Sequence, residues 1–298
     1  MQSSTARTSD AGKTVWPWLG AVAAMLAALF WSYWAVVDGL FKTWQRSQNY
    51  SVGALVPLAA LYLLWHERVA LSRTPIRACW WGLIFVLFAQ GARAFGLLYV
   101  FESVERYSLV LSILGVVLLV AGWRVFWRVR WILAFLFLMV PLPARVHNLI
   151  SGPLQDYATT GAVYVLELMG TIITREGNVM VLNGVTQVAV AEACSGLRML
   201  TAFVVVGSVL AYIVKRPRWQ KVVLVVSTVP VAIVCNLIRL VVTAELFATV
   251  SSELANTFFH DFAGLTMMPI AIFILAGELW LMAKLVVPEE PRHAGVCN

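Results

Sequence analysis

Charged residues are scarce in this chain. They make up 12% of its 298 residues, whereas hydrophobic residues make up 61%. A soluble globular domain is about 25% charged and about 45–50% apolar, so an ordinary soluble enzyme is excluded, as is a disordered chain. Four cysteines are too few for a disulfide-stapled secreted domain, and no glycine-rich fingerprint for dinucleotides or phosphates occurs. The composition therefore predicts an all-α polytopic membrane protein.

Long apolar runs are what the sequence does contain. A bilayer core requires about 20 apolar residues per helix, and the runs predict eight transmembrane helices. They form one membrane domain, 16–287, between terminal tails 1–15 and 288–298. The first run is too long for a signal-peptide core, so we expect it to remain uncleaved. Pro230 predicts a kink in the seventh span. The predicted spans are 16–37, 50–65, 79–100, 107–123, 131–142 (with its start near Val125), 195–214, 220–250 and 262–287.

The distribution of positive charge predicts an orientation. The chain has 22 lysines and arginines against 15 acidic residues, a net charge of +7. With the N-terminus inside, fourteen basic residues fall in inner segments and five in outer segments, as the positive-inside rule requires. Both termini are then cytoplasmic, and because topology accounts for the charge we expect no nucleic-acid partner. The remaining three, Arg93, Arg198 and Arg239, lie within predicted spans.

One outer segment, 143–193, is long. Its first half, 147–170, mixes apolar and polar residues in the manner of a helix lying at the membrane interface. Its second half places Asn183-Gly184 between two β-prone runs, 178–182 and 185–190, which predicts a β-hairpin with a two-residue turn. An irregular loop is the alternative. A hairpin would lead directly into the segment 192–198, where the sixth span begins.

Cys194 is the one cysteine that this topology places at the outer surface. An unpaired thiol in an oxidising compartment indicates reactivity, and a helix N-terminus favours its thiolate. Arg198 lies one turn further along the same helix face. Cys194 is therefore a candidate nucleophile, although a small buried hydrophobic residue is the alternative.

Four other polar residues share the outer half of the predicted membrane domain. Charged residues within membrane spans are costly and usually functional, and Arg93 and Arg239 both lie within predicted spans. For Arg93, the alternative is a side chain that only snorkels outward or pairs with another helix. Asn236 shares a helix face with Arg239. His260 lies at the outer mouth of the eighth span, at a depth that allows a thiol–imidazole pair with Cys194, although it could serve only as a polar anchor.

Three ordered motifs resemble the exosortase/archaeosortase family. They are Glu-Ala-Cys-Ser-Gly-Leu-Arg at 192–198, Asn-Leu-Ile-Arg at 236–239 and His-Asp-Phe-Ala-Gly at 260–264. The segments 175–178 and 141–143 are also similar, and the resemblance covers roughly 16–284. It implies Cys194, Arg239 and His260 as catalytic residues. The residues expected to contact substrate or to support the catalytic groups are Arg198, Asn236, Glu192, Asp261 and Arg93.

The resemblance also implies a reaction and a location. Family members are cysteine proteases and transpeptidases of the bacterial inner membrane, with the active site at the outer, periplasmic face. Their substrates are surface proteins with a C-terminal sorting signal, which consists of a Pro-Glu-Pro motif, a membrane helix and a basic cluster. An amine or hydroxyl acceptor resolves a thioester, and the genes often accompany exopolysaccharide synthesis. No cofactor or metal is expected, since His147 and His260 lack a carboxylate cluster.

Two other classes remain open from the residues alone. A transporter would use the buried arginines to bind an anionic solute, and would be expected to show inverted repeats or paired broken helices. A non-catalytic component of exopolysaccharide export would need no reactive thiol at Cys194.

Overall fold

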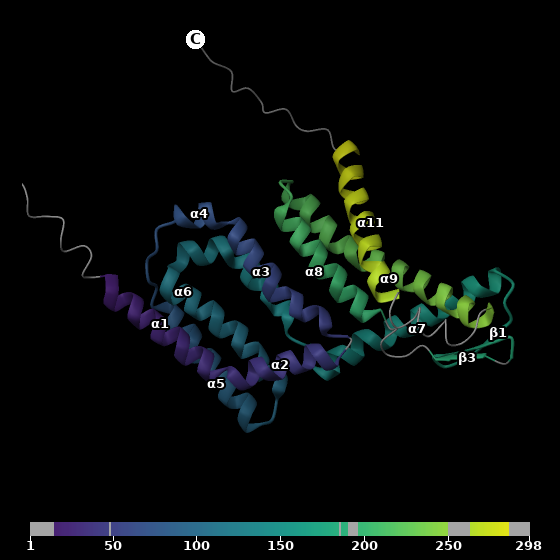
Figure 1. The fold of residues 1–298 in the computed structure, drawn as a ribbon, viewed down its shortest axis with the longest axis horizontal. Helices are drawn as coiled ribbons and strands as arrows, with labels where there is room; N and C mark the ends of the chain where they lie inside the picture. Colours follow the sequence, from purple (N-terminus) through teal and green to yellow (C-terminus); the bar gives the residue numbers. More distant parts are fainter. Residues whose placement is uncertain (1–14, 48, 185, 190–195, 250–262, 286–298) are drawn as a thin grey trace, which may run out of the picture. The chain divides into compact units, whose positions relative to one another are not determined.

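The computed structural model describes residues 15–47, 49–184, 186–189, 196–249 and 263–285. The described chain is mostly helical and carries one small sheet (Figure 1), which confirms the helical class. It divides into two compact units, Met1–Pro141 and Leu142–Asn298.

Unit 1 is built from apolar helices. Such helices satisfy their backbone hydrogen bonds internally, which is what a lipid environment demands. Glu67 and Arg128 form an ion pair at 3.4 Å, and Trp44 Nε1 donates to the Met139 carbonyl at 3.1 Å. The elements are α1 (Val15–Ser32), α2 (Trp34–Arg46), η1 (Ser51–Ala54), α3 (Leu55–His66), α4 (Arg68–Ser72), α5 (Trp81–Leu98), α6 (Glu102–Phe135) and η2 (Leu136–Met139).

Helix α6 folds back on itself at Gly122. That residue has non-helical backbone angles, φ 82° and ψ 177°. The rings of Tyr107 and Phe137 stack with their centroids 6.2 Å apart, whereas thirty residues of straight helix would separate them by about 45 Å. The chain must therefore reverse between them. This agrees with two separate predicted helices, one ending at 123 and the next starting near 125.

The first predicted span, 16–37, is not one straight helix. It bends by 55° between α1 and α2, at Tyr33, which is fully buried. The Tyr33 hydroxyl lies 3.0 Å from Ser108 Oγ and 2.8 Å from Ser112 Oγ. These hydrogen bonds fix the bend, because a buried hydroxyl without partners would be costly.

Unit 2 contains the three-stranded sheet and four long helices among its described residues. Helix α9 packs against α7, α8 and α11. Ser227 Oγ on α9 donates to Glu278 Oε2 on α11 at 2.6 Å. The elements are α7 (Ala144–Leu168), β1 (Ile173–Glu176), β2 (Val179–Leu182), β3 (Thr186–Ala189), α8 (Leu197–Ile213), α9 (Arg218–Thr249) and α11 (Ala263–Leu285).

The predicted hairpin and the predicted helix before it are both present. Strand β2 pairs antiparallel with β3, and Leu182 pairs with Thr186, so three residues rather than the predicted two connect the strands. Asn183 and Gly184 have φ of 51° and 71°, the left-handed region that these residue types tolerate best. Strand β1 adds to the other side of β2 and was not predicted.

A local core seats the sheet against α7 and α9 (Figure 1). Met180 and Leu182 on β2 are fully buried. They are two strand positions apart and lie on one face of the sheet, as the period of a strand requires. Their partners from the helices are Ala158, Ala162 and Leu166 of α7 and Leu240 and Ala244 of α9.

The predicted count of eight spans is not established. Three helices in the described part of the chain are long and apolar enough to cross a membrane, or four if α1 and α2 form one bent span. The three are 81–98, 102–139 and 218–247, and the second of these is the stretch that folds back at Gly122. Helix α8 has 17 residues and is about 26 Å long, short of a core of about 30 Å.

Candidate functional site

Gly196 brings two of the three sequence motifs into contact. It is the N-cap of α8 and adopts a left-handed conformation with φ 84°. A Cβ at this position would lie 3.0 Å from Asn236 Nδ2 and 3.1 Å from Asn236 Cγ, so a larger residue would have to displace the amide. Glycine is required here both by the backbone conformation and by the close approach. Gly196, which follows Cys194 by two positions in the sequence, therefore lies against Asn236 on the helix that carries Arg239.

Arg239 is buried beside this contact. Its side chain is 7% exposed, and its Nη2 donates to Asn236 Oδ1 at 3.0 Å. The two residues are three apart on α9, which places them on one face of the helix. Thr243 Oγ1, a further turn along, donates to the Arg239 carbonyl at 2.7 Å. Asn236 thus contacts the N-cap of α8 and also holds the guanidinium.

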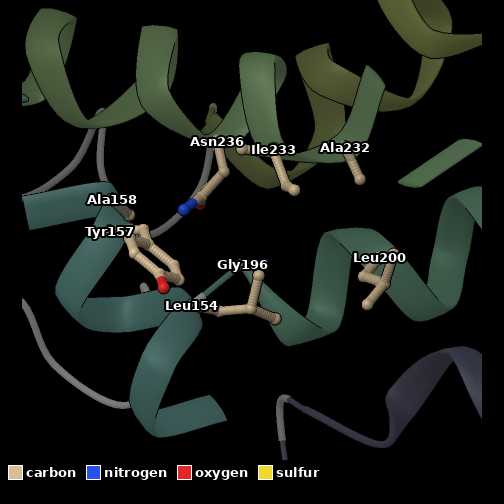
Figure 2. Close-up of a pocket in the computed structure, with 8 residues that line it drawn as sticks. All are labelled: Leu154, Tyr157, Ala158, Gly196, Leu200, Ala232, Ile233 and Asn236. Carbon is tan, nitrogen blue, oxygen red and sulfur yellow. The ribbon is translucent and has the colours of Figure 1, made fainter. Parts of the chain in front are cut away.

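A pocket opens at the same place, between α7, α8 and α9 (Figure 2). The empty space in and around it, counting space open to the surroundings, is about 350 Å³. Figure 2 shows the Asn236 amide and the Tyr157 ring at the end where Gly196 lies. Most of the lining is apolar, so the site offers one amide and one phenol to an otherwise apolar ligand. The lining residues are Leu154, Tyr157, Ala158, Gly196, Leu200, Ala232, Ile233 and Asn236.

The other predicted site residues of unit 2 divide into two groups. Cys194, Glu192, His260 and Asp261 lie outside the described residues. Arg198 lies in the first turn of α8 and is half-buried, and its carbonyl accepts a hydrogen bond from Thr201 Oγ1 at 2.9 Å.

Arg93 belongs to unit 1 and has partners there. Its guanidinium donates to Ser32 Oγ and lies 4.6 Å from the centre of the Tyr33 ring. Both partners lie at the bend between α1 and α2. A cation over a desolvated aromatic face is stabilised, so the in-span charge has a local role in holding this bend.

Sequence reasoning missed an anchor between the sheet and α7. Arg175 on β1 donates through Nε to the Gly177 carbonyl at 2.7 Å and through Nη1 to Thr160 Oγ1 at 2.6 Å. Its Nη2 forms an ion pair with Asp156. Thr171 Oγ1, just before β1, donates to Glu245 of α9 at 3.4 Å. The sequence motif that contains Arg175 could have indicated a role for this residue. It could not identify the partners, because the acceptors of Arg175 on α7 lie 15 and 19 residues away in the sequence.

Metal-ligating residues do not gather within the described ranges. No group of three or more histidine, cysteine, aspartate or glutamate side chains occurs there. Within the described residues, the site combines a guanidinium, an amide and a left-handed helix N-cap beside an apolar pocket.

These features are those of a helical membrane protein in which a buried arginine lies close to the residues that follow a candidate nucleophilic cysteine. The model of the transmembrane exosortase family (Exosortase_EpsH) matches residues 44–277, and the chain belongs to this family. The match confirms the resemblance that the three motifs carry. No curated protein and no solved structure matches the chain.

Proposed function

We propose that this protein is a membrane-embedded cysteine protease and transpeptidase that cleaves C-terminal sorting signals. The observation that carries the proposal is the contact between Gly196 and Asn236. Two peptide bonds separate Cys194 from Gly196, so covalent geometry keeps the Cα atoms of these residues within about 7 Å. Arg239 is hydrogen-bonded to Asn236. Asn236 thus contacts both the proposed cation and a residue two positions after the proposed nucleophile, which supports a shared site for the two.

The proposed chemistry uses three residues. The Cys194 thiolate attacks the scissile carbonyl, the carbon–nitrogen bond breaks and a thioester forms. His260 accepts the thiol proton and passes it to the leaving amine. Arg239 stabilises the oxyanion or binds the glutamate of the motif, and its burial strengthens either interaction because the local dielectric is low. An amine or hydroxyl acceptor then resolves the thioester by transpeptidation, and water would resolve it by hydrolysis.

The supporting residues follow from their positions in the motifs. Asn236 positions Arg239. Arg198, Glu192 and Asp261 are proposed to contact substrate or to support the three catalytic groups. Arg93 was expected to act with them, and its proposed role is to hold the bend between α1 and α2 through Tyr33.

The proposed location is the bacterial inner membrane, with both termini cytoplasmic and the site at the periplasmic face. Contacts within unit 1 support the predicted alternation of segments. Glu67 pairs with Arg128, and both lie in segments predicted to be inside. Trp44 bonds to Met139, and both lie at ends predicted to be outside. The proposed partners are the bilayer, substrates with a sorting signal and an amine or hydroxyl acceptor.

Single-residue variants test the proposal in cells that express a tagged reporter protein ending in Pro-Glu-Pro, an apolar helix and a basic cluster. Wild type should shorten the reporter, and Cys194→Ala, Cys194→Ser, Arg239→Ala and His260→Ala should abolish or strongly reduce shortening. Cys235→Ala is the matched control, because Cys235 is a buried free thiol on α9. Undiminished processing by Cys194→Ala would overturn the thiol mechanism.

One observation favours the transporter class. The break between α1 and α2 lies beside the in-span Arg93, and broken helices mark solute sites in transporters. Solute flux in liposomes that survives alkylation of Cys194 would support this class over the protease. A non-catalytic export component would not process the reporter, and its Cys194 thiol would not react with membrane-impermeant reagents.

A further inference from the structure

Strand β3 leaves one backbone edge unpaired within the described chain. The sheet order is β1-β2-β3, so β3 pairs with β2 along one edge and with no described strand along the other. In an antiparallel strand, alternate residues direct their N–H and C=O groups to opposite edges. The open edge therefore presents backbone donors and acceptors in the spacing of a strand.

The two edges of this sheet differ in charge. Strand β1 carries Arg175 and Glu176, and charged residues on an edge strand discourage pairing with another chain. Strand β3 has the sequence Thr-Gln-Val-Ala and carries no charge and no proline. Gln187, in its middle, is exposed. Of the two edges, β3 is thus the one suited to accept another strand.

The position of β3 in the chain also distinguishes it from β1. Cys194 follows Ala189 by five positions in the sequence, which is at most about 18 Å of extended chain. The local core of α7, β2 and α9 holds the sheet in place, and the Arg175 hydrogen bonds fix it to α7. A segment added to β3 would be held by a fixed platform, a short length of chain away from the proposed nucleophile.

We infer that the open edge of β3 is the docking site for an extended segment of the substrate polypeptide, which adds to the sheet as a fourth strand. Main-chain hydrogen bonds would supply the affinity, as in other cases of strand addition. The inference rests on the proposed function, and it assigns to the sheet the role of aligning the scissile bond with Cys194.

The proposed Pro-Glu-Pro motif fits this geometry. Its two prolines are two residues apart, so in an extended strand their backbone nitrogens, which carry no hydrogen, face the same edge. An added strand is itself the new outer edge of the sheet. With both prolines directed outward, the glutamate between them directs its N–H and C=O to β3.

Disulfide trapping tests the inference without requiring catalysis. The chain is made free of its own cysteines by replacing Cys79, Cys194, Cys235 and Cys297 with alanine, and Gln187→Cys is added on β3. Reporters carry single cysteines at successive positions through the Pro-Glu-Pro region. Cα atoms of paired strand residues lie about 4.5–5.5 Å apart, within the range that a disulfide spans. Thr174→Cys, exposed on β1, is the matched control.

Strand addition predicts that Gln187→Cys cross-links the reporter position paired with it at least about tenfold more than the positions on either side, whose side chains face the other side of the sheet, and that Thr174→Cys cross-links none. Absent cross-links, equal cross-linking at every position, or an equal yield at Thr174→Cys would overturn docking on β3. Processing by the wild type is measured separately. If the wild type processes the reporter but the cross-link pattern is absent, docking on β3 alone is refuted. If the wild type does not process the reporter, the proposed function is refuted and the docking proposal with it.

Discussion

Gly196 lies so close to Asn236 that a Cβ on the glycine would stand 3.0 Å from the amide nitrogen. The glycine precedes α8 and the asparagine lies within α9, so two of the sequence motifs meet at this contact. Asn236 also accepts a hydrogen bond from Arg239. A change at Gly196 should therefore reach the arginine through one intervening side chain.

Gly196→Ala is expected to reduce reporter processing at least about tenfold. The left-handed backbone costs about 1–2 kcal/mol for a residue with a Cβ, and the added methyl group must displace Asn236. Gly170→Ala separates these two effects, because Gly170 also has a positive φ, of 92°, but a Cβ there would meet no atom within 4 Å. The control should lose similar stability in thermal unfolding and keep normal processing. Equal losses of processing in both variants would contradict a role for the Asn236 contact.

Asn236→Ala is expected to lower kcat by about 10- to 100-fold, corresponding to about 1.4–2.7 kcal/mol, with a smaller effect on KM. The amide positions the Arg239 guanidinium, and the proposed role of that cation is to stabilise charge that develops in the transition state. Steady-state kinetics with a detergent-solubilised reporter would separate the two constants. Asn148→Ala, at an exposed site on α7, is the control. A change in KM alone would assign Arg239 to substrate binding.

The hairpin and its neighbourhood show how far local sequence signals reach. Asn183-Gly184 predicted β2 and β3 because both residues tolerate the left-handed conformation that they adopt. Strand β1 escaped prediction because its four residues include Arg175 and Glu176, whereas strands are usually rich in β-branched and aromatic residues. Its position is held by tertiary contacts to α7 rather than by propensity.

Long-range packing explains the remaining differences from the predicted structure. The bend at Tyr33 has no proline or glycine to mark it, and its hydroxyl partners Ser108 and Ser112 are 75 and 79 residues away. Sequence position predicts a depth in the membrane for Arg239 and for the segment after Cys194, but no lateral position. The approach of that segment to Asn236 is a property of how α8 packs on α9.

Gly122→Ala is expected to destabilise unit 1 by at least about 2 kcal/mol. The residue has φ 82° and ψ 177°, a region that only glycine adopts readily and that alone costs about 1–3 kcal/mol for alanine, and a Cβ would collide with the Arg77 carbonyl oxygen. Tyr107 on α6 could then no longer stack on Phe137 of η2. Thermal unfolding in detergent measures the effect, and Gly91→Ala, at an open helical site, is the control. An unchanged midpoint would contradict the reversal at Gly122.

Tyr33→Phe is expected to destabilise the bend between α1 and α2 by about 1–3 kcal/mol, because it removes the hydroxyl that two buried serines share. The ring remains, so the contact with Arg93 is kept. Tyr62→Phe, on the exposed face of α3, should change little. Hydrogen exchange localises the effect: faster exchange confined to the residues around Tyr33 is expected, and uniform protection in both variants would contradict it.

Arg175→Lys is expected to impair processing almost as much as Arg175→Ala, although the charge is kept. The guanidinium bonds to three acceptors at once, the Gly177 carbonyl, Thr160 and Asp156, and an ammonium group cannot reproduce that planar geometry. Loss of the anchor should loosen the sheet from α7, and limited proteolysis within 170–184 would detect this. Lys42→Ala is the control, since it removes an ion pair with Asp38 one helical turn away, and exposed pairs of this kind contribute little. If Arg175→Lys kept both processing and protease resistance, charge alone would suffice, and the seating of the sheet on α7 would not depend on the guanidinium geometry.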